Sequence, residues 1–318
     1  VNDTHTVTSF TKQHSSDVQN LIKKIHEQMA NIDMSKLNYD AFGEAYEKML
    51  ANELGNSSKR YGQYFTRRDL IDLIIKELNV KETDLCYDPS CGTGGFILGF
   101  AKQFRKNKKF IEKNIWGQEF LLDVYKTLSF NMLAFNMDSC LKNLKWGDSI
   151  KEEWHKQIIN KFDKIGGNPP FGMSIECKNK DYPVIVKDSV ALFLQHCYYA
   201  LKDGGTAGLV IDRGILNNGT DKQNSWEKRL RKFLLENTSI TKIINLPTGI
   251  FKHTNFATSV IFFTKGTPTK KIKYIEGYFK DEDKGKGRGK SREKDKDKDK
   301  DKDKDKDKDK NKDKDKDK

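Results

Sequence analysis

The fold of this chain is decided by the stretch Leu85-Cys86-Tyr87-Asp88-Pro89-Ser90-Cys91-Gly92-Thr93-Gly94-Gly95. Its apolar start predicts a strand over Leu85–Tyr87, and its end leads into the apolar stretch Gly95–Phe104, which predicts a helix. The glycines between them permit a tight turn and a close approach of the backbone to a ligand. Because the first amides of a helix favour an anionic group, this turn is a candidate site for a carboxylate or a phosphate.

Short apolar runs alternate with helical patterns downstream of this turn. Further strands are predicted at Ile115–Gly117, Phe162–Ile165, Thr206–Ile211, Ile240–Leu246 and Thr258–Thr264, and helices at Val124–Phe135, Ser189–Leu201 and Trp226–Leu235. This alternation is typical of βαβ units, so the predicted fold class is α/β with a doubly wound, mostly parallel, Rossmann-like sheet. No convincing helix joins the last two strands, which predicts an antiparallel hairpin at the sheet edge.

A helix is also predicted just before the first strand. Its apolar stripe consists of Leu70, Ile71, Ile74, Ile75 and Leu78. Thr66 stands three residues before Asp69, which predicts a capping box with Asp in place of Glu. Residues 1–60 read as a small helical region, in which Tyr39–Leu54 has an apolar face.

Charge divides the chain. It has 318 residues, 59 basic and 46 acidic, for a net charge of +13. Residues 281–318 hold 18 basic and 15 acidic residues and no apolar side chain, which predicts a disordered tail. Residues 1–280 retain 41 basic and 31 acidic residues, so the remainder is itself basic. The predicted organisation is therefore residues 1–60, a catalytic domain over residues 61–280, and the tail.

Several classes of protein are excluded or disfavoured. No run approaches the roughly 18–20 apolar residues of a membrane helix, and no signal peptide is recognisable. The five cysteines contain no CxxC pair, which predicts neither a disulfide framework nor a zinc site and fits a cytoplasmic protein. No P-loop pattern occurs, which argues against an NTPase. Because the chain starts at Val1, we expect a fragment or a processed form.

Acidic residues follow further predicted strands. Glu119 closes the second strand, and Asp148 follows Lys145-Trp146-Gly147 near the end of a third. Acids at the carboxyl ends of adjacent parallel strands can bind ribose hydroxyls and an exocyclic amine. Together with Asp88 they predict a site for a nucleoside-bearing cofactor.

The most informative motif is Asn168-Pro169-Pro170-Phe171, which follows the strand Phe162–Ile165. The prolines fix φ and hold the backbone carbonyls in place. The Asn168 side-chain carbonyl and the Pro169 backbone carbonyl can both accept from one NH₂ group. Phe171 can stack on a planar ring. The motif therefore predicts a corner that holds an exocyclic amine in front of an electrophile.

The turn Asp88–Gly95 and the corner Asn168–Phe171 together resemble the S-adenosylmethionine-dependent amino-methyltransferases of DNA. The segment Gly62–Arg68 narrows the resemblance to N6-adenine methyltransferases, especially the modification subunit of type I restriction-modification systems. It extends from about Tyr39 to Gly277 and implies a Rossmann-like methyltransferase fold. The usual proline of the family is replaced by Arg67, which we expect to pair with the cofactor carboxylate.

The resemblance implies a role for each matching residue. Residues expected to bind S-adenosylmethionine are Gln63, Tyr64, Phe65, Thr66, Arg67, Arg68, Asp88, Gly92, Thr93, Gly94 and Gly95, with Glu119 on the ribose and Asp148 on the adenine. The target adenine is expected at Asn168, Pro169, Pro170 and Phe171. Direct transfer of the methyl group to adenine N6 needs no covalent enzyme intermediate, so neither a catalytic cysteine nor a metal is expected.

The implied partners are double-stranded DNA and a specificity subunit, because no sequence-reading domain is visible after Thr264. Whether an endonuclease subunit joins them stays open. So do three other readings: a stand-alone DNA adenine methyltransferase, an RNA or protein amino-methyltransferase, and a non-catalytic DNA-binding subunit.

Overall fold

The computed structural model describes residues 66–151, 156–177, 181–219, 224–251 and 257–277. The predictions for residues 1–60, for Gln63, Tyr64 and Phe65, and for residues 281–318 lie outside this part. The predicted domain boundaries at residues 60 and 280 therefore stay predictions.

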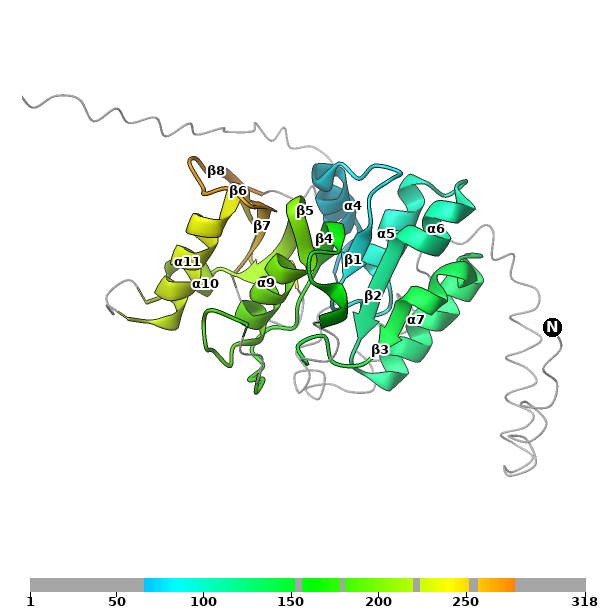
Figure 1. Cartoon of the computed structure of the whole chain (residues 1–318), viewed down its shortest axis with the longest axis horizontal. Helices are drawn as coiled ribbons and strands as arrows, with labels where there is room; N and C mark the ends of the chain where they lie inside the picture. The colour runs from blue at the N-terminus through cyan, green and yellow to red at the C-terminus, as the bar shows by residue number, and fades with distance from the viewer. Residues whose placement is uncertain (1–65, 152–155, 178–180, 220–223, 252–256, 278–318) are drawn as a thin grey trace, which may run out of the picture. The chain divides into compact units, whose positions relative to one another are not determined.

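The described residues contain an eight-stranded sheet in the order β3-β2-β1-β4-β5-β7-β6-β8 (Figure 1). The strands are β1 (Cys86–Asp88), β2 (Ile115–Glu119), β3 (Leu144–Trp146), β4 (Phe162–Gly167), β5 (Leu201–Asp212), β6 (Thr238–Asn245), β7 (Thr258–Lys265) and β8 (Lys273–Glu276). Neighbours are parallel except at β7, which runs antiparallel to β5 and to β6. The predicted α/β class with a mostly parallel sheet is confirmed.

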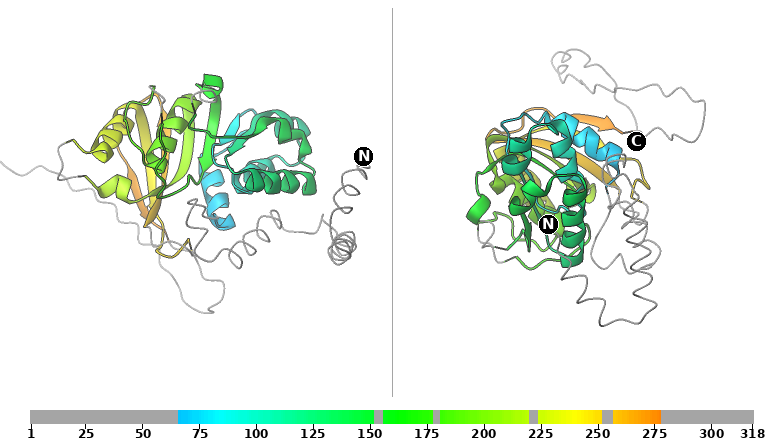
Figure 2. Two further views of the ribbon diagram at one scale, coloured as in Figure 1. Left: turned by 90° about the horizontal axis from the view of Figure 1, so that it is seen from below. Right: turned by 90° about the vertical axis from the view of Figure 1, so that its right-hand side faces the viewer.

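Helices pack on both faces of this sheet (Figure 2). They are α4 (Arg68–Leu78), α5 (Gly95–Gln103), α6 (Lys108–Asn114), α7 (Leu122–Ala134), the 3₁₀ helix η3 (Asp138–Asn143), α9 (Ser189–Ala200), α10 (Gly214–Asn217) and α11 (Trp226–Asn237). On one face, a Cβ placed at Gly166 of β4 would meet the rings of Phe96 and Phe100 of α5. On the other, Tyr87 of β1 contacts His196 of α9. The sheet is therefore doubly wound, as predicted. No helix among those described is long and apolar enough to cross a membrane.

The start of α4 differs from its prediction. The apolar stripe is buried against α5 and the sheet as expected, with Leu70, Ile71 and Ile74 at 0 % exposure. The prediction of a capping box is wrong, because Arg67 is the N-cap residue and no side chain caps the helix. Asp69 instead pairs with the Arg67 guanidinium at 2.8 Å, and the Thr66 hydroxyl bonds elsewhere.

The antiparallel hairpin is confirmed, but its predicted place at the sheet edge is wrong. Strand β7 lies between β5 and β6, and nearly all of its residues are buried. The run Val260–Phe263 is apolar at every position, as expected for a strand covered on both faces. The edge is formed by β8, which was not predicted because only one residue of Lys273–Glu276 is even partly buried.

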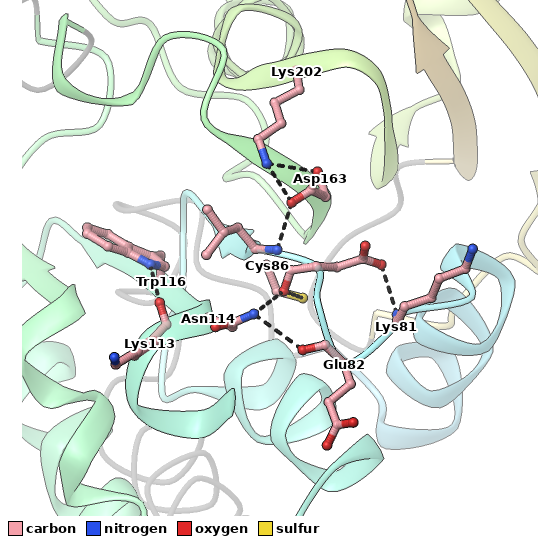
Figure 3. Close-up of polar contacts among 10 residues, drawn as sticks. Lys81, Glu82, Cys86, Lys113, Asn114, Trp116, Asp163 and Lys202 are labelled. Atoms are coloured by element: carbon pink, nitrogen blue, oxygen red, sulfur yellow. Dashed lines mark hydrogen bonds and ion pairs between the residues drawn. The ribbon is translucent and has the colours of Figure 1, made fainter. Parts of the chain in front are cut away.

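Polar contacts join the amino-terminal ends of the central strands (Figure 3). An Asp163 carboxylate oxygen accepts from the Leu85 backbone amide at 2.9 Å, and the Lys202 ammonium contacts both oxygens of that carboxylate at 2.9 and 3.0 Å. Nearby, the Asn114 side-chain amide donates to the Asp84 carbonyl at 3.1 Å. These contacts fix β1, β2 and β4 at one end, which leaves the carboxyl ends for the candidate site.

Candidate active site

The carboxyl ends of β1, β2, β3 and β4 lie at the same edge of the sheet because these strands are parallel. Asp88 ends β1 and Glu119 ends β2, and Asp148 and Asn168 follow the next two strands of the chain. The structure therefore brings the three acids and the amide to one edge, although they are spread over 80 positions of the sequence.

The glycine-rich turn has the backbone geometry that its composition predicts. Gly92 and Gly94 have positive φ values of 56° and 105°, which side-chain-bearing residues rarely adopt. A Cβ at Gly94 would lie 2.6 Å from Leu128 Cδ1, and one at Gly95 would lie 2.7 Å from Ile71 Cδ1. No side chain caps the start of α5. Glycine is thus required here both for conformation and for the close packing of α4 and α7.

Asp88 is a buried carboxyl with one satisfied oxygen. It is 1 % exposed, its Oδ1 accepts from the Ser90 amide at 2.9 Å, and its Oδ2 is buried with no partner among the described residues. Burial raises the pKa of Asp88 to about 8; the Ser90 amide opposes this shift and the Glu119 charge adds to it. Such a carboxyl favours an incoming cation, because a cation would stabilise its charged form.

Glu119 joins two of the loops at this edge. Its Oε2 accepts from the Gly92 amide at 2.9 Å, and its Oε1 accepts from the Leu121 amide at 2.8 Å. Burial raises the pKa of Glu119, and the hydrogen bonds from the backbone amides of Leu121 and Gly92 counteract this rise. Each carboxylate oxygen can accept more than one hydrogen bond, so Glu119 can still receive hydroxyl donors.

The third acid lies on a loop that is tied back to the first. Asp148 is half-buried, and its Oδ1 accepts from the Ile150 amide at 2.9 Å. Next to it, the Ser149 hydroxyl donates to the Pro89 carbonyl at 2.6 Å. This bond fixes the spacing between the loops that follow β1 and β3.

The Asn-Pro-Pro-Phe corner is held from both sides. The Asn168 Nδ2 donates to the Thr66 Oγ1 at 2.9 Å, and the Ser189 hydroxyl donates to the Pro170 carbonyl at 2.6 Å. Phe171 is 2 % exposed, and its ring lies 6.0 Å from that of Phe251. The ring does not line the cavity described next, and its stacking on a target base stays a prediction.

One cavity of about 400 Å³ connects the glycine-rich turn with the corner. Its lining includes Ser90, Gly92, Glu119, Asp148, Asn168 and Pro170. Asp88 lies behind this lining, next to Pro89 and Ser90. The volume is in the range of small-molecule and cofactor sites. The two motifs therefore open into one space, as the predicted reaction requires.

Sequence reasoning missed several residues of this site. Phe120, Leu121, Val124, Met173, Ser174, Ile175, Glu176 and Phe193 also line the cavity. Segment Met173–Ile175 is held by backbone bonds to Lys187 and Ser189, in front of α9. These residues are placed by long-range packing that no local sequence pattern reports.

The structure describes only part of the segment Gly62–Arg68. Gln63, Tyr64 and Phe65 lie outside the described residues. Arg67 is paired with Asp69 at the surface, and Arg68 Nη1 donates to the Thr66 carbonyl at 3.1 Å. The cofactor-binding roles expected for this segment therefore stay predictions. No cluster suited to a metal ion occurs in the part of the chain that the structure describes.

Comparison with known proteins identifies type I methylase subunits among the relatives of this chain. The methylase subunit of the type I restriction enzyme MpnII from Mycoplasma pneumoniae is 29 % identical over 282 residues, which cover 80 % of this chain and 51 % of that protein. The methylase subunit of the type I restriction enzyme EcoEI from Escherichia coli is 27 % identical over 291 residues, which cover 85 % of this chain and 57 % of that protein. The chain thus spans about half the length of the curated relatives it matches.

Solved structures with a similar fold include a type I subunit. The methyltransferase subunit of a type I restriction-modification system from Streptococcus thermophilus has a TM-score of 0.62 at 24 % identity, covering 79 % of this chain and 54 % of that one. The family model described as N-6 DNA Methylase matches residues 37–317. The chain therefore belongs to the N-6 DNA Methylase family.

Proposed function

We propose that this chain transfers a methyl group from S-adenosylmethionine to N6 of adenine in DNA, as the modification subunit of a type I-like restriction-modification system. The observation that carries the proposal is the shared cavity, which Glu119 and Asp148 line together with Asn168 and Pro170 of the corner. Family membership supports the reaction class and the DNA substrate. The named relatives support the type I assignment.

The donor side of the cavity fits a nucleoside-bearing sulfonium cofactor. Glu119 and Asp148 lie in its wall, where Glu119 would hold the ribose hydroxyls and Asp148 the adenine amine. Gly92, where a Cβ would meet nothing within 4 Å, leaves space for the methionine part. The buried Asp88 Oδ2 would accept from its ammonium group. The cofactor supplies an electrophilic methyl carbon.

The acceptor side fits an exocyclic amine. Asn168 Oδ1 and the Pro169 carbonyl would accept the two hydrogens of adenine N6, which turns the nitrogen lone pair towards the methyl carbon. As the new N–C bond forms, the methyl–sulfur bond of the sulfonium would break and leave a neutral thioether. The positive charge would then pass to N6, where the two oxygens would stabilise it. Loss of one proton from N6 to solvent would leave neutral N6-methyladenine. The protein contributes orientation and polarisation and forms no bond to the substrate.

The rest of the proposal concerns DNA and partners. The target base must leave the stack to reach the cavity, at a cost of a few kcal/mol. The excess of basic residues in positions 1–280 would offset part of that cost by phosphate contacts. We propose that the sequence of the site is read by a specificity subunit, and that an endonuclease subunit is a further partner.

A methyl-transfer assay tests the proposal. The full chain, co-purified with a specificity subunit, is incubated with S-adenosylmethionine labelled in the methyl group and with unmodified DNA. We expect label in N6-methyladenine, little label without the partner, and none with Asn168→Ala. Asn237→Ala is a matched control, because the Asn237 side chain bonds to the Phe233 carbonyl on α11. Label in RNA or protein, or full activity of Asn168→Ala, would contradict the proposal.

A further inference from the structure

Thr66 makes an unexpected long-range contact. Its pattern predicts a helix cap, but its side-chain oxygen accepts from the Asn168 Nδ2 at 2.9 Å, across 102 positions of sequence. Both side chains are partly buried. The contact joins the segment before α4 to the corner that follows β4.

This contact restrains the Asn168 amide. An asparagine amide has an acceptor at one end and two donors at the other, and a threonine hydroxyl can either accept or donate. The hydroxyl therefore does not select one end of the amide. It limits the rotation of the side chain, and in the structure Nδ2 is the end that faces Thr66.

Thr66 is itself held in place by the cofactor side of the site. The Arg68 Nη1 donates to its carbonyl at 3.1 Å. The same nitrogen lies so close to Gly95 that a Cβ there would approach it to 2.9 Å. Arg68 opens α4, whose apolar stripe is buried at 0–3 % exposure. The position of the Thr66 hydroxyl therefore depends on rigid elements and on the glycine-rich turn.

We propose that Thr66 is a positioning residue for methyl transfer, whose hydroxyl restrains the Asn168 amide that would polarise the target amine. This inference rests on the proposed function and adds a role that differs from cofactor binding. It assigns to Thr66 an effect on the rate of transfer that is larger than any effect on the affinity for the methyl donor.

Two variants test this role in the full chain with its specificity subunit. Thr66→Val keeps the shape of the side chain and removes the hydroxyl, and Thr66→Ser keeps the hydroxyl. We expect Thr66→Val to lower the single-turnover methyl-transfer rate by about 10- to 100-fold, because small misplacements of reacting groups have effects of this size. We expect its Tm to match the wild type, any loss of donor affinity to be much smaller than the loss of rate, and Thr66→Ser to restore most of the rate. Thr241→Val, on the exposed side of β6, is the matched control.

An NMR measurement gives a readout that does not depend on activity. The Asn168 side-chain NH₂ signals, identified by their loss in Asn168→Ala, should shift in Thr66→Val and stay near their positions in Thr66→Ser. Unchanged signals in Thr66→Val, an unchanged rate, or an equal loss of donor affinity would each overturn the role. If the signals shift in Thr66→Val as expected but the wild-type chain transfers no methyl group, the proposed function would be contradicted. The contact between Thr66 and Asn168 would then still be established.

Discussion

At the scale of single residues, Asp88 is a carboxyl whose surroundings oppose its charge. It is 1 % exposed, and its Oδ2 is buried with no partner among the described residues. In the protein without a bound cation, a group with a pKa of about 8 holds its proton at neutral pH. The turn therefore contains a protonated carboxyl group at the place where the resemblance to N6-adenine methyltransferases puts the cofactor.

This acid should make folding stability depend on pH. The pKa of Asp88 is about 8 in the folded protein and about 3.9 in an unfolded chain, so the neutral buried form stabilises the fold below pH 4, and this stabilisation is lost as pH rises to 8. We expect the free energy of unfolding of the wild type to fall relative to that of Asp88→Asn by up to about 1.4 kcal/mol per pH unit in this window. Urea denaturation of both proteins at pH 5, 6, 7 and 8 measures it. Parallel pH profiles would show that Asp88 does not titrate in this way.

The same group should release a proton when the methyl donor binds. An ammonium group beside Asp88 stabilises the carboxylate and lowers its pKa. At pH 7 we expect binding of S-adenosylmethionine to release a substantial fraction of one proton, and Asp88→Asn to remove that release. Calorimetric titrations in buffers of different ionisation enthalpy give the number of protons. Equal proton release by the two proteins would remove Asp88 from the binding site.

At the scale of elements, the residue that precedes α5 is a glycine that is crowded and has a positive φ. Gly94 has a φ of 105°, and a Cβ there would lie 2.6 Å from Leu128 Cδ1 of α7. Gly204 provides a comparison, because its φ is 78° but a Cβ there would meet nothing within 4 Å. The two glycines separate the cost of backbone strain from the cost of crowding.

The pair predicts different losses of stability. Gly204→Ala should cost about 1 kcal/mol for placing alanine in the left-handed region. Gly94→Ala should cost about 1–3 kcal/mol more, because α7 must shift from the turn. It should also weaken methyl-donor binding, whereas Gly204→Ala should not. Urea denaturation and donor titration of both variants provide the test. Equal losses of unfolding free energy in the two variants would show that α7 can shift without an energetic cost.

Most elements were predictable because their signals are local. The strands β1, β2, β4, β5, β6 and β7 carry apolar runs, and α4, α5, α7, α9 and α11 carry helical patterns. The short helix α6 buries only Phe110 and Ile111 and escaped prediction for lack of a pattern. The site acids were predictable because parallel strands bring their carboxyl ends together. The contacts of Thr66 and Ser189 were not, since they depend on tertiary packing across many residues.

At the scale of the whole molecule, charge distinguishes the body from the tail. Residues 281–318 hold almost as many acidic as basic residues, whereas residues 1–280 carry 41 basic and 31 acidic ones. A protein that contacts DNA phosphates releases counterions. The logarithm of its association constant therefore falls linearly with the logarithm of the salt concentration, and each phosphate neutralised adds about 0.9 to the steepness of the slope. The alternating tail neutralises much of its own charge. The body should therefore carry most of this dependence.

DNA binding should then be strongly salt-dependent and largely indifferent to the tail. We expect the affinity of the full chain for duplex DNA to fall by an order of magnitude or more between roughly 50 and 200 mM salt. A chain ending at Lys280 should give a log–log slope within about one unit of the full-length value, since one unit corresponds to about one phosphate contact. Fluorescence anisotropy with a labelled duplex across a KCl series measures both slopes. A slope that falls by half on removal of the tail would place the DNA contacts in residues 281–318 and contradict the assignment to the body.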